Sequence, residues 1–86
     1  MRFKIKASKE FEKRYREITK KDKPLKERLD KAIDKLKEHP HAGKPLKHDL
    51  AGLRSLRVGK YRVIYLINEK NKIIWLITLD HRDKIY

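Results

Sequence analysis

The sequence predicts an α+β fold with the element order β-α-α-β-β-β, in which an antiparallel sheet carries an N-terminal helical hairpin on one face. In the first half of the chain, apolar residues recur at helical spacing among many charged residues. After residue 52, the pattern changes to short runs of β-branched and aromatic residues separated by turn residues. A chain of 86 residues buries too little surface to build two cores, so residues 1–86 are expected to form a single domain.

The first half predicts a strand followed by two helices. Residues 2–6 alternate basic and apolar side chains, which is typical of a short, half-buried strand. Ser8 is a candidate N-cap for a helix that ends near Lys20. Pro24 suits the first turn of a second helix, which ends before residues 39–40. Because the connection between the helices is short, we expect an antiparallel helical hairpin.

The second half predicts a meander of three strands. Glycine, proline and polar residues mark a loop over residues 41–52. Gly59 and Lys60 fit a two-residue type II′ turn, with glycine first. The strand around Trp75 is apolar on both faces, so we place it inside the sheet. The predicted strands cover residues 53–58, 61–67 and 72–79.

The charge balance predicts a polyanionic partner. The chain has 25 Lys and Arg against 12 Asp and Glu, which gives a formal net charge of +13. Counterion release from a phosphate backbone favours binding by such a domain. Hyperthermophile proteins are also rich in charged residues, but that enrichment adds both signs, and here cations outnumber anions about two to one.

Other features exclude several classes of protein and site. The chain contains no cysteine, which excludes a disulfide framework and thiolate metal sites. The first residues alternate basic and apolar side chains and contain no long apolar run, so the sequence predicts neither a signal peptide nor a membrane anchor. We therefore expect a cytoplasmic protein without a membrane partner.

Two arginines on neighbouring strands predict a phosphate-binding site. If Gly59 and Lys60 form a two-residue turn, Arg57 lies directly opposite Arg62 in the sheet. Like charges opposite each other are destabilising, so the pair is best explained by an anion that fills the space between them. The guanidinium group suits both the binding of a phosphodiester and the stabilisation of charge that develops when the phosphate is attacked. The alternative is that both side chains extend into solvent at a strand end.

The C-terminal residues form a second candidate cluster. His81 can exchange protons near neutral pH, and Arg82 can join the phosphate-binding arginines. Tyr86 can stack on a base or carry a proton if nearby cations lower its pKa. The alternative interpretation is a solvated, frayed terminus, because chain ends are often poorly ordered.

The histidines do not predict a metal site. His39, His41 and His48 fall within ten positions, but their spacing matches no zinc pattern, and they lie in a loop rich in Pro and Gly. The sequence also lacks a nucleophile motif and a glycine-rich phosphate loop. We therefore expect chemistry without a metal or another cofactor.

The segment LRSLRVGKYRVIY (53–65), with an apolar strand and HRDKIY (81–86) after it, resembles the RelE/ParE toxin superfamily over nearly the whole chain. Members are small and basic and share the predicted element order. In the RelE branch, toxins bind in the ribosomal A site and cut mRNA there, with the substrate's 2′-hydroxyl as the nucleophile. The resemblance implies a ribosome-dependent endoribonuclease (mRNA interferase) of a type II toxin–antitoxin system, restrained by an acidic RelB-like antitoxin.

The same resemblance implies roles for individual residues. Arg62 matches the arginine that binds the phosphate and stabilises the transition state, and Arg57 supplies a second arginine from the preceding strand. The terminal segment supplies three further catalytic candidates, His81, Arg82 and Tyr86. The candidate RNA-binding residues are Arg54, Lys60, Lys47 and Lys84.

Two other functions remain open. The ParE branch shares the fold but poisons DNA gyrase and generally lacks this arginine–tyrosine set. A non-catalytic RNA-binding module would use the arginines with Tyr61, Tyr65 or Trp75, but the apolar pattern around these aromatic residues predicts that they pack in the core. Some RelE toxins carry basic residues near the positions of Leu53 and Ser55, so the proton acceptor is not identified.

Overall fold

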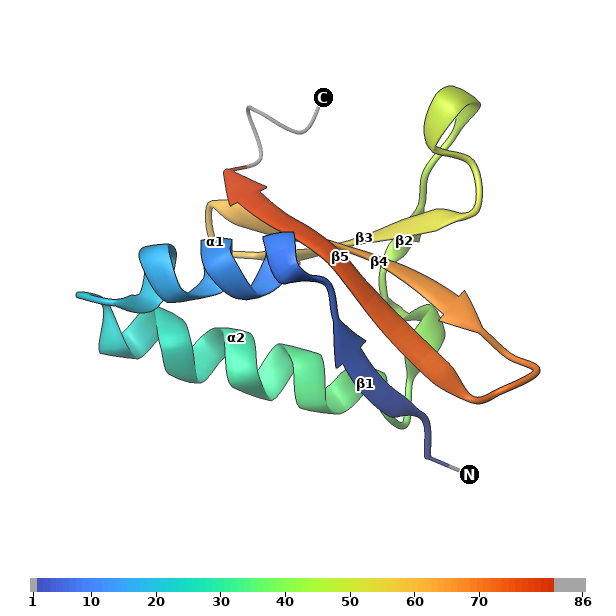
Figure 1. The fold of residues 1–86 in the computed structure, drawn as a ribbon, viewed down its shortest axis with the longest axis horizontal. Coiled ribbons are helices and arrows are strands. Elements are labelled where there is room, and N and C mark those ends of the chain that lie inside the picture. The colour runs from blue at the N-terminus through green and yellow to red at the C-terminus, as the bar shows by residue number, and fades with distance from the viewer. Residues whose placement is uncertain (1, 82–86) are drawn as a thin grey trace.

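The computed structural model describes residues 2–81, in which two helices pack against one face of a five-stranded sheet (Figure 1). Two 3-10 turns, η1 and η2, lie in the connection between the helices and the last three strands. The elements are β1 (Lys4–Ala7), α1 (Lys9–Thr19), α2 (Lys23–Leu36), η1 (Pro40–Ala42), β2 (Lys44–Pro45), η2 (His48–Leu50), β3 (Leu53–Val58), β4 (Tyr61–Asn68) and β5 (Ile73–His81).

Both predicted helix starts are confirmed by their caps. Ser8 Oγ accepts a hydrogen bond from Phe11 N at 3.0 Å, which satisfies one of the free donors at the start of α1. Asp22 does the same for α2 through Leu25 N at 3.0 Å, and Pro24 lies in the first turn, as predicted. The two helices form the expected hairpin, and no helix within residues 2–81 is long and apolar enough to span a bilayer.

The sheet is mixed, so the prediction of a purely antiparallel sheet is wrong in one strand. The strand order is β1-β5-β4-β3-β2, and the pairs from β2 to β5 are all antiparallel. β1, however, runs parallel to β5, with Lys4 opposite Ile73 and Ala7 opposite Leu76. Alternation of polar and apolar residues identifies a strand and its buried face, but it contains no information on the direction of the neighbouring strand.

The connection predicted as a loop contains a short fifth strand. β2 pairs with β3, with Lys44 opposite Ser55 and Pro45 opposite Arg54. Pro45 is compatible with this strand because β2 is at the edge of the sheet, where a missing N–H group breaks no ladder. Two residues are too few for an alternation pattern, which explains why the sequence did not reveal the strand.

The core lies between the helices and one face of the sheet. Val63 and Tyr65 of β4 and Leu79 of β5 are fully buried there, against helix residues that include Leu29 and Leu36. Neither α1 nor α2 covers the opposite face, which we call the open face of the sheet (Figure 1).

Trp75 belongs to the open face and is only half-buried. It is absent from the core cluster, and Lys6 Nζ lies 5.7 Å from its ring centroid. The expectation that this aromatic residue packs in the core is therefore wrong, although Tyr65 is fully buried and Tyr61 packs against the core. The prediction that this strand lies inside the sheet, made because it is apolar on both faces, is confirmed: β5 lies between β1 and β4.

Candidate functional site

The hairpin of β3 and β4 brings Arg57 and Arg62 together as predicted. Val58 pairs with Tyr61, and Arg57 is the direct cross-strand partner of Arg62. Gly59 has a φ of 60°, whereas Lys60 does not adopt a positive φ, which fits the predicted type II′ turn. The two-residue turn fixes the register that places Arg57 directly opposite Arg62 on the same face of the sheet.

Arg62 is the more restrained of the two arginines. Its side chain is half-buried on the open face, and Nη1 donates a hydrogen bond to Ser55 Oγ at 3.3 Å. Ser55 of β3 lies on the same face of the sheet as Arg62 and is buried. Arg57 is exposed, so the pair combines a positioned guanidinium group with one that can move toward a ligand.

A carboxylate on β5 borders this pair, and sequence reasoning did not include it in the site. β5 continues to His81, two residues beyond the predicted strand end, so that Asp80 lies opposite Arg62. Asp80 Oδ2 accepts a hydrogen bond from Arg14 Nη1 of α1 at 2.8 Å, and Oδ1 accepts one from the His81 N–H group at 2.7 Å. These contacts hold Asp80 in place and link α1 to the edge of the arginine pair.

The structure places His81 on the other face of the sheet from Arg57 and Arg62. His81 lies opposite Tyr61, and neighbouring residues of a strand point to opposite faces. The imidazole and phenol rings form an edge contact with centroids 5.8 Å apart. The other predicted residues of the C-terminal segment, Arg82, Lys84 and Tyr86, lie outside the described residues.

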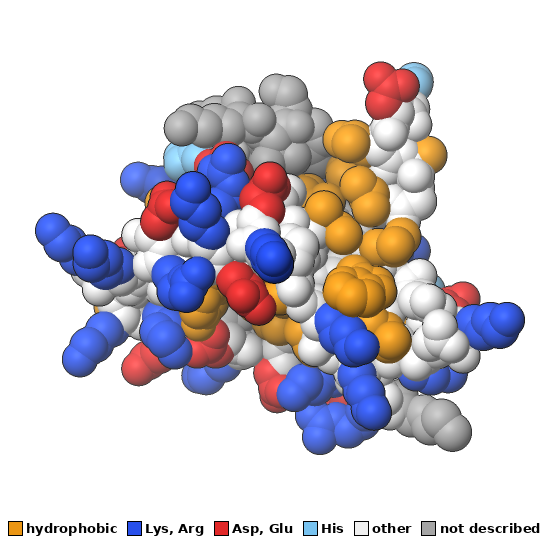
Figure 2. Space-filling model, in the orientation of Figure 1, with side chains coloured by type: hydrophobic (Ala, Val, Ile, Leu, Met, Phe, Trp, Pro, Cys, Tyr) orange, Lys and Arg blue, Asp and Glu red, His pale blue; other side chains and the backbone are white. Residues whose placement is uncertain are grey.

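The predicted RNA-binding residues are not gathered at one place. Lys60 is exposed in the turn next to the arginine pair. Lys47 instead borders a hollow of about 500 Å³ beside β2 and η2, together with Leu46 and Leu50. Figure 2 shows hydrophobic side chains gathered on the right of the view, below the loop that carries η2, with cations over much of the remaining surface.

Arg54 has a structural role that the sequence did not suggest. Its Nη1 donates hydrogen bonds to the carbonyl oxygen of Gly43 at 2.6 Å and to that of His41 at 3.3 Å. Tyr65 fixes the same segment, because its hydroxyl donates to Pro40 O at 2.7 Å and accepts from Gly43 N at 2.9 Å. Burial raises the pKa of Tyr65, despite the opposing effects of the Gly43 hydrogen bond and the Arg54 charge, so the hydroxyl remains a donor.

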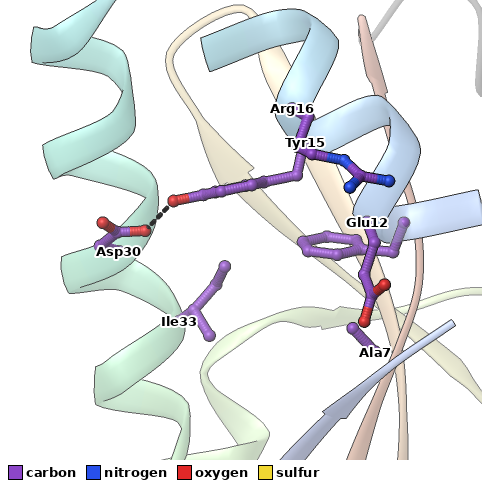
Figure 3. Close-up of a pocket in the computed structure, with 7 residues that line it drawn as sticks. Ala7, Glu12, Tyr15, Arg16, Asp30 and Ile33 are labelled. Carbon is purple, nitrogen blue, oxygen red and sulfur yellow. Dashed lines mark hydrogen bonds between the residues drawn. The ribbon is translucent and has the colours of Figure 1, made fainter. Parts of the chain in front are cut away.

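A second hollow, of about 290 Å³, lies between the two helices (Figure 3). Figure 3 shows Tyr15 of α1 reaching across to Asp30 of α2, to which its hydroxyl donates a hydrogen bond. Lys26 Nζ binds the other oxygen of the same carboxylate at 3.0 Å. The hollow contains none of the predicted site residues, and its Tyr15 and Asp30 are already paired with each other.

The described part of the chain contains no group of three or more His, Asp or Glu side chains arranged to hold a metal ion. The chemistry available on the open face comes from guanidinium groups, a restrained carboxylate and a serine hydroxyl. Such a set can bind and orient a phosphodiester and stabilise additional negative charge on it.

Comparison with known proteins places the chain in a family. A family model described as the ParE toxin of the type II toxin-antitoxin system, parDE, matches residues 2–86. Toxin RelG of Mycobacterium tuberculosis is 40% identical over 53 residues, which cover 62% of this chain and 61% of that toxin. This chain therefore spans less than two thirds of the length of that relative.

Solved structures agree with the fold. The toxin-antitoxin complex RelBE2 from M. tuberculosis contains a chain with a TM-score of 0.82 and 25% identity, covering 95% of this chain and 100% of that one. The archaeal RelE-RelB complex from Pyrococcus horikoshii gives a TM-score of 0.76 and 27% identity, covering 98% and 99%. Because the family model matches almost the entire sequence and the fold agrees throughout, the chain belongs to the RelE/ParE superfamily of type II toxin–antitoxin toxins.

Proposed function

We propose that this toxin is a ribosome-dependent endoribonuclease, an mRNA interferase that cleaves messages in the ribosomal A site. The observation that carries the proposal is the direct pairing of Arg57 with Arg62 on the open face of the sheet. A tight turn fixes two arginines opposite each other on one face, and a phosphodiester is an anion whose oxygens suit the planar donors of the guanidinium group. The RelE and RelG names of its relatives favour this branch of the superfamily.

The proposed reaction needs positioning and charge stabilisation more than a strong base. The substrate's 2′-oxygen attacks the adjacent phosphorus, the bond to the 5′-oxygen breaks, and the products are a 2′,3′-cyclic phosphate and a 5′-hydroxyl. One proton leaves the 2′-hydroxyl and one is delivered to the 5′-oxygen. Arg62 and Arg57 bind the non-bridging oxygens, whose negative charge increases during attack. The ribosome contributes by presenting the message in a distorted conformation.

We assign proton transfer to the C-terminal residue Tyr86, with Arg82 and Lys84 as additional phosphate contacts, because the arginine guanidinium stays protonated at any ordinary pH. His81 contributes by positioning, because its ring packs against Tyr61 and thereby anchors the strand end that leads into this segment. This assignment needs neither a metal ion nor another cofactor.

The decisive test replaces Arg62. We expect Arg62→Ala to lower the cleavage rate by about 10²–10³-fold, because it removes a preorganised donor from the transition state. Arg62→Lys should recover only part of the activity, since lysine keeps the charge but lacks the planar fork of donors. The measurement is primer-extension mapping of message ends after brief expression, and of purified toxin on messages with and without ribosomes.

Arg16→Ala is the matched control, because Arg16 is an exposed arginine on α1 and should leave cleavage unchanged. An Arg62→Ala protein that folds and still cleaves messages at the wild-type rate would refute the assignment.

A second candidate function follows from the description of the family model, which names a ParE toxin. In that case the target would be DNA gyrase and not RNA. Purified toxin would then inhibit gyrase-catalysed supercoiling and leave messages intact on ribosomes, whereas an mRNA interferase would give the opposite result. A non-catalytic RNA-binding module would do neither and would only retain RNA.

A further inference from the structure

A basic groove lies on the side of the molecule where α2 faces β3. It has a volume of about 380 Å³ and includes four cations: Arg28, Lys31 and Lys35 from α2, and Arg57 from β3. The rest of its lining is small or apolar: Ala32, Ala42, Leu56, Val58 and Gly59. None of the described residues that line it is acidic, and all four cations are exposed.

Three cations of α2 lie apart from its ion-paired acidic residues, and Glu27, four residues before Lys31, forms no ion pair with them within residues 2–81. Arg28, Lys31 and Lys35 follow the spacing i, i+3, i+7 and share one face of the helix. Asp30 and Asp34 lie on the other flank and are already engaged there, Asp30 with Tyr15 and Lys26, and Asp34 with Arg2 and Lys37.

Within residues 2–81, none of the four groove cations forms an ion pair with a carboxylate. A surface adapted only for solubility would intersperse the two signs of charge. The groove therefore has an uncompensated positive charge that favours an anionic ligand.

The groove is continuous with the arginine pair of the proposed active site. Arg57 belongs to both, since it borders the groove and is also the cross-strand partner of Arg62. At the turn between β3 and β4, a side chain on Gly59 would place its Cβ 3.2 Å from Arg28 Nη1. The glycine thus lets the Arg28 guanidinium lie close to the turn and bridge the groove and the hairpin.

We propose that this groove binds the phosphodiester backbone of the substrate RNA next to the cleaved bond, as an extension of the active site. The inference rests on the proposed ribonuclease function, because it assumes that Arg57 and Arg62 hold the scissile phosphate. Exposed cations above a shallow floor suit a phosphate backbone, which is bound mainly through charge. An acidic polypeptide of the antitoxin could also contact Leu56 and Val58 in the lining, so the test below includes it as an outcome.

The test compares two triple variants that each remove three positive charges from the same total of +13. The groove variant is Arg28→Gln/Lys31→Gln/Lys35→Gln. The control variant is Lys20→Gln/Lys21→Gln/Lys23→Gln, in the exposed connection between α1 and α2 and at the start of α2. Binding is measured by fluorescence anisotropy over a range of salt concentrations, with 2′-O-methyl RNA, which cannot be cleaved through its own 2′-oxygen.

Two RNA lengths separate the groove from the active site. A trinucleotide reaches only the arginine pair, whereas an RNA of about 12 nucleotides can also occupy the groove. The wild-type protein and the control should bind the longer RNA more tightly than the trinucleotide, and the groove variant should lose most of this gain. For the longer RNA, the logarithm of the association constant falls as the logarithm of the salt concentration rises. In the groove variant this slope should become less steep by about 2, since each of three lost phosphate contacts on a single strand contributes about 0.7.

The inference is overturned if the groove variant and the control variant lose the same affinity for the long RNA, because the effect would then come from net charge alone. It is also overturned if the groove variant binds RNA normally but loses affinity for the antitoxin, which would identify an acidic polypeptide as the occupant. Failure of the proposed function is a separate result: Arg62→Ala would then leave message cleavage intact, whatever the groove variant does.

Discussion

Tyr65 illustrates how one buried side chain can organise a functional surface without taking part in it. Its ring is fully buried in the core, yet its hydroxyl binds both the carbonyl oxygen of Pro40 and the N–H group of Gly43. These bonds fix the chain where it leaves α2 and η1 and enters β2. Since β2 pairs with β3, the hydroxyl helps to hold the strand that carries Arg57.

We expect Tyr65→Phe to lower the free energy of unfolding by about 1–3 kcal/mol, because it leaves a buried donor and a buried acceptor without their partner. Tyr61→Phe is the matched control: within residues 2–81 its hydroxyl forms no hydrogen bond, so the substitution should cost little. Urea denaturation of both variants measures the difference. Equal stability losses in the two variants would contradict the role given to the Tyr65 hydroxyl.

Residue-level prediction from the sequence succeeded where local geometry decides the outcome. The pairing of Arg57 with Arg62 follows from a two-residue turn, and the structure shows it. Prediction failed where a contact joins distant segments. Nothing in the sequence indicates that Arg14 binds Asp80 across 66 positions, or that Arg54 holds the backbone at Gly43 in preference to facing a ligand.

At the scale of elements, the β3–β4 hairpin is the part on which the proposed site depends most. Its register is fixed by a turn in which Gly59 has a φ of 60°, a conformation that L-residues with a side chain adopt only with strain. A one-residue slip would move Arg57 and Arg62 to the face covered by the helices. The turn therefore has a functional as well as a structural role.

We expect Gly59→Ala to destabilise the protein by about 1–2 kcal/mol through backbone strain. It should also lower message cleavage by up to about 100-fold, because small displacements of positioning groups are costly for a reaction that depends on geometry. Gly52→Ala is the control: Gly52 also has a positive φ, 95°, but no atom lies within 4 Å of the added Cβ. It should lose comparable stability and keep its cleavage rate, and equal cleavage by the two variants would argue against the role of the turn.

The elements that the sequence failed to predict share a physical reason. Both helices, the Ser8 cap and the three strands of the meander follow from local patterns of residues. The two-residue β2 and the parallel direction of β1 depend on contacts made only after folding. Ser8 N donates to Leu76 O at 2.9 Å and Phe3 N to Lys37 O at 2.8 Å, and these bonds fix β1 between β5 and the end of α2.

At the scale of the whole molecule, charge is the dominant property. The net charge of +13 is least balanced in the groove between α2 and β3, whose four cations form no ion pair within residues 2–81, whereas several acidic residues pair with cations on the helices. A free protein with this field binds polyanions with little selectivity. For a toxin, this property calls for a partner that both neutralises the charge and covers the site.

We therefore propose that an acidic RelB-like antitoxin restrains this toxin by lying across the open face. The similar mycobacterial and archaeal structures are complexes of a toxin with its antitoxin. An extended acidic chain can neutralise a large basic surface and cover it at the same time, because it orders only when it binds.

The last prediction concerns how this complex forms and what it covers. The association rate of the toxin with its antitoxin should fall steeply as salt increases, while the dissociation rate changes little, because long-range attraction acts mainly on the encounter. Hydrogen exchange should show new protection over residues 54–62, which carry the arginine pair, when the complex is compared with the free toxin. Stopped-flow association at several salt concentrations and peptide-resolved exchange provide the two measurements. Protection confined to α1 and α2, with residues 54–62 as exposed as in the free toxin, would mean that the antitoxin acts only by blocking access to the ribosome, and that it does not cover the arginine pair.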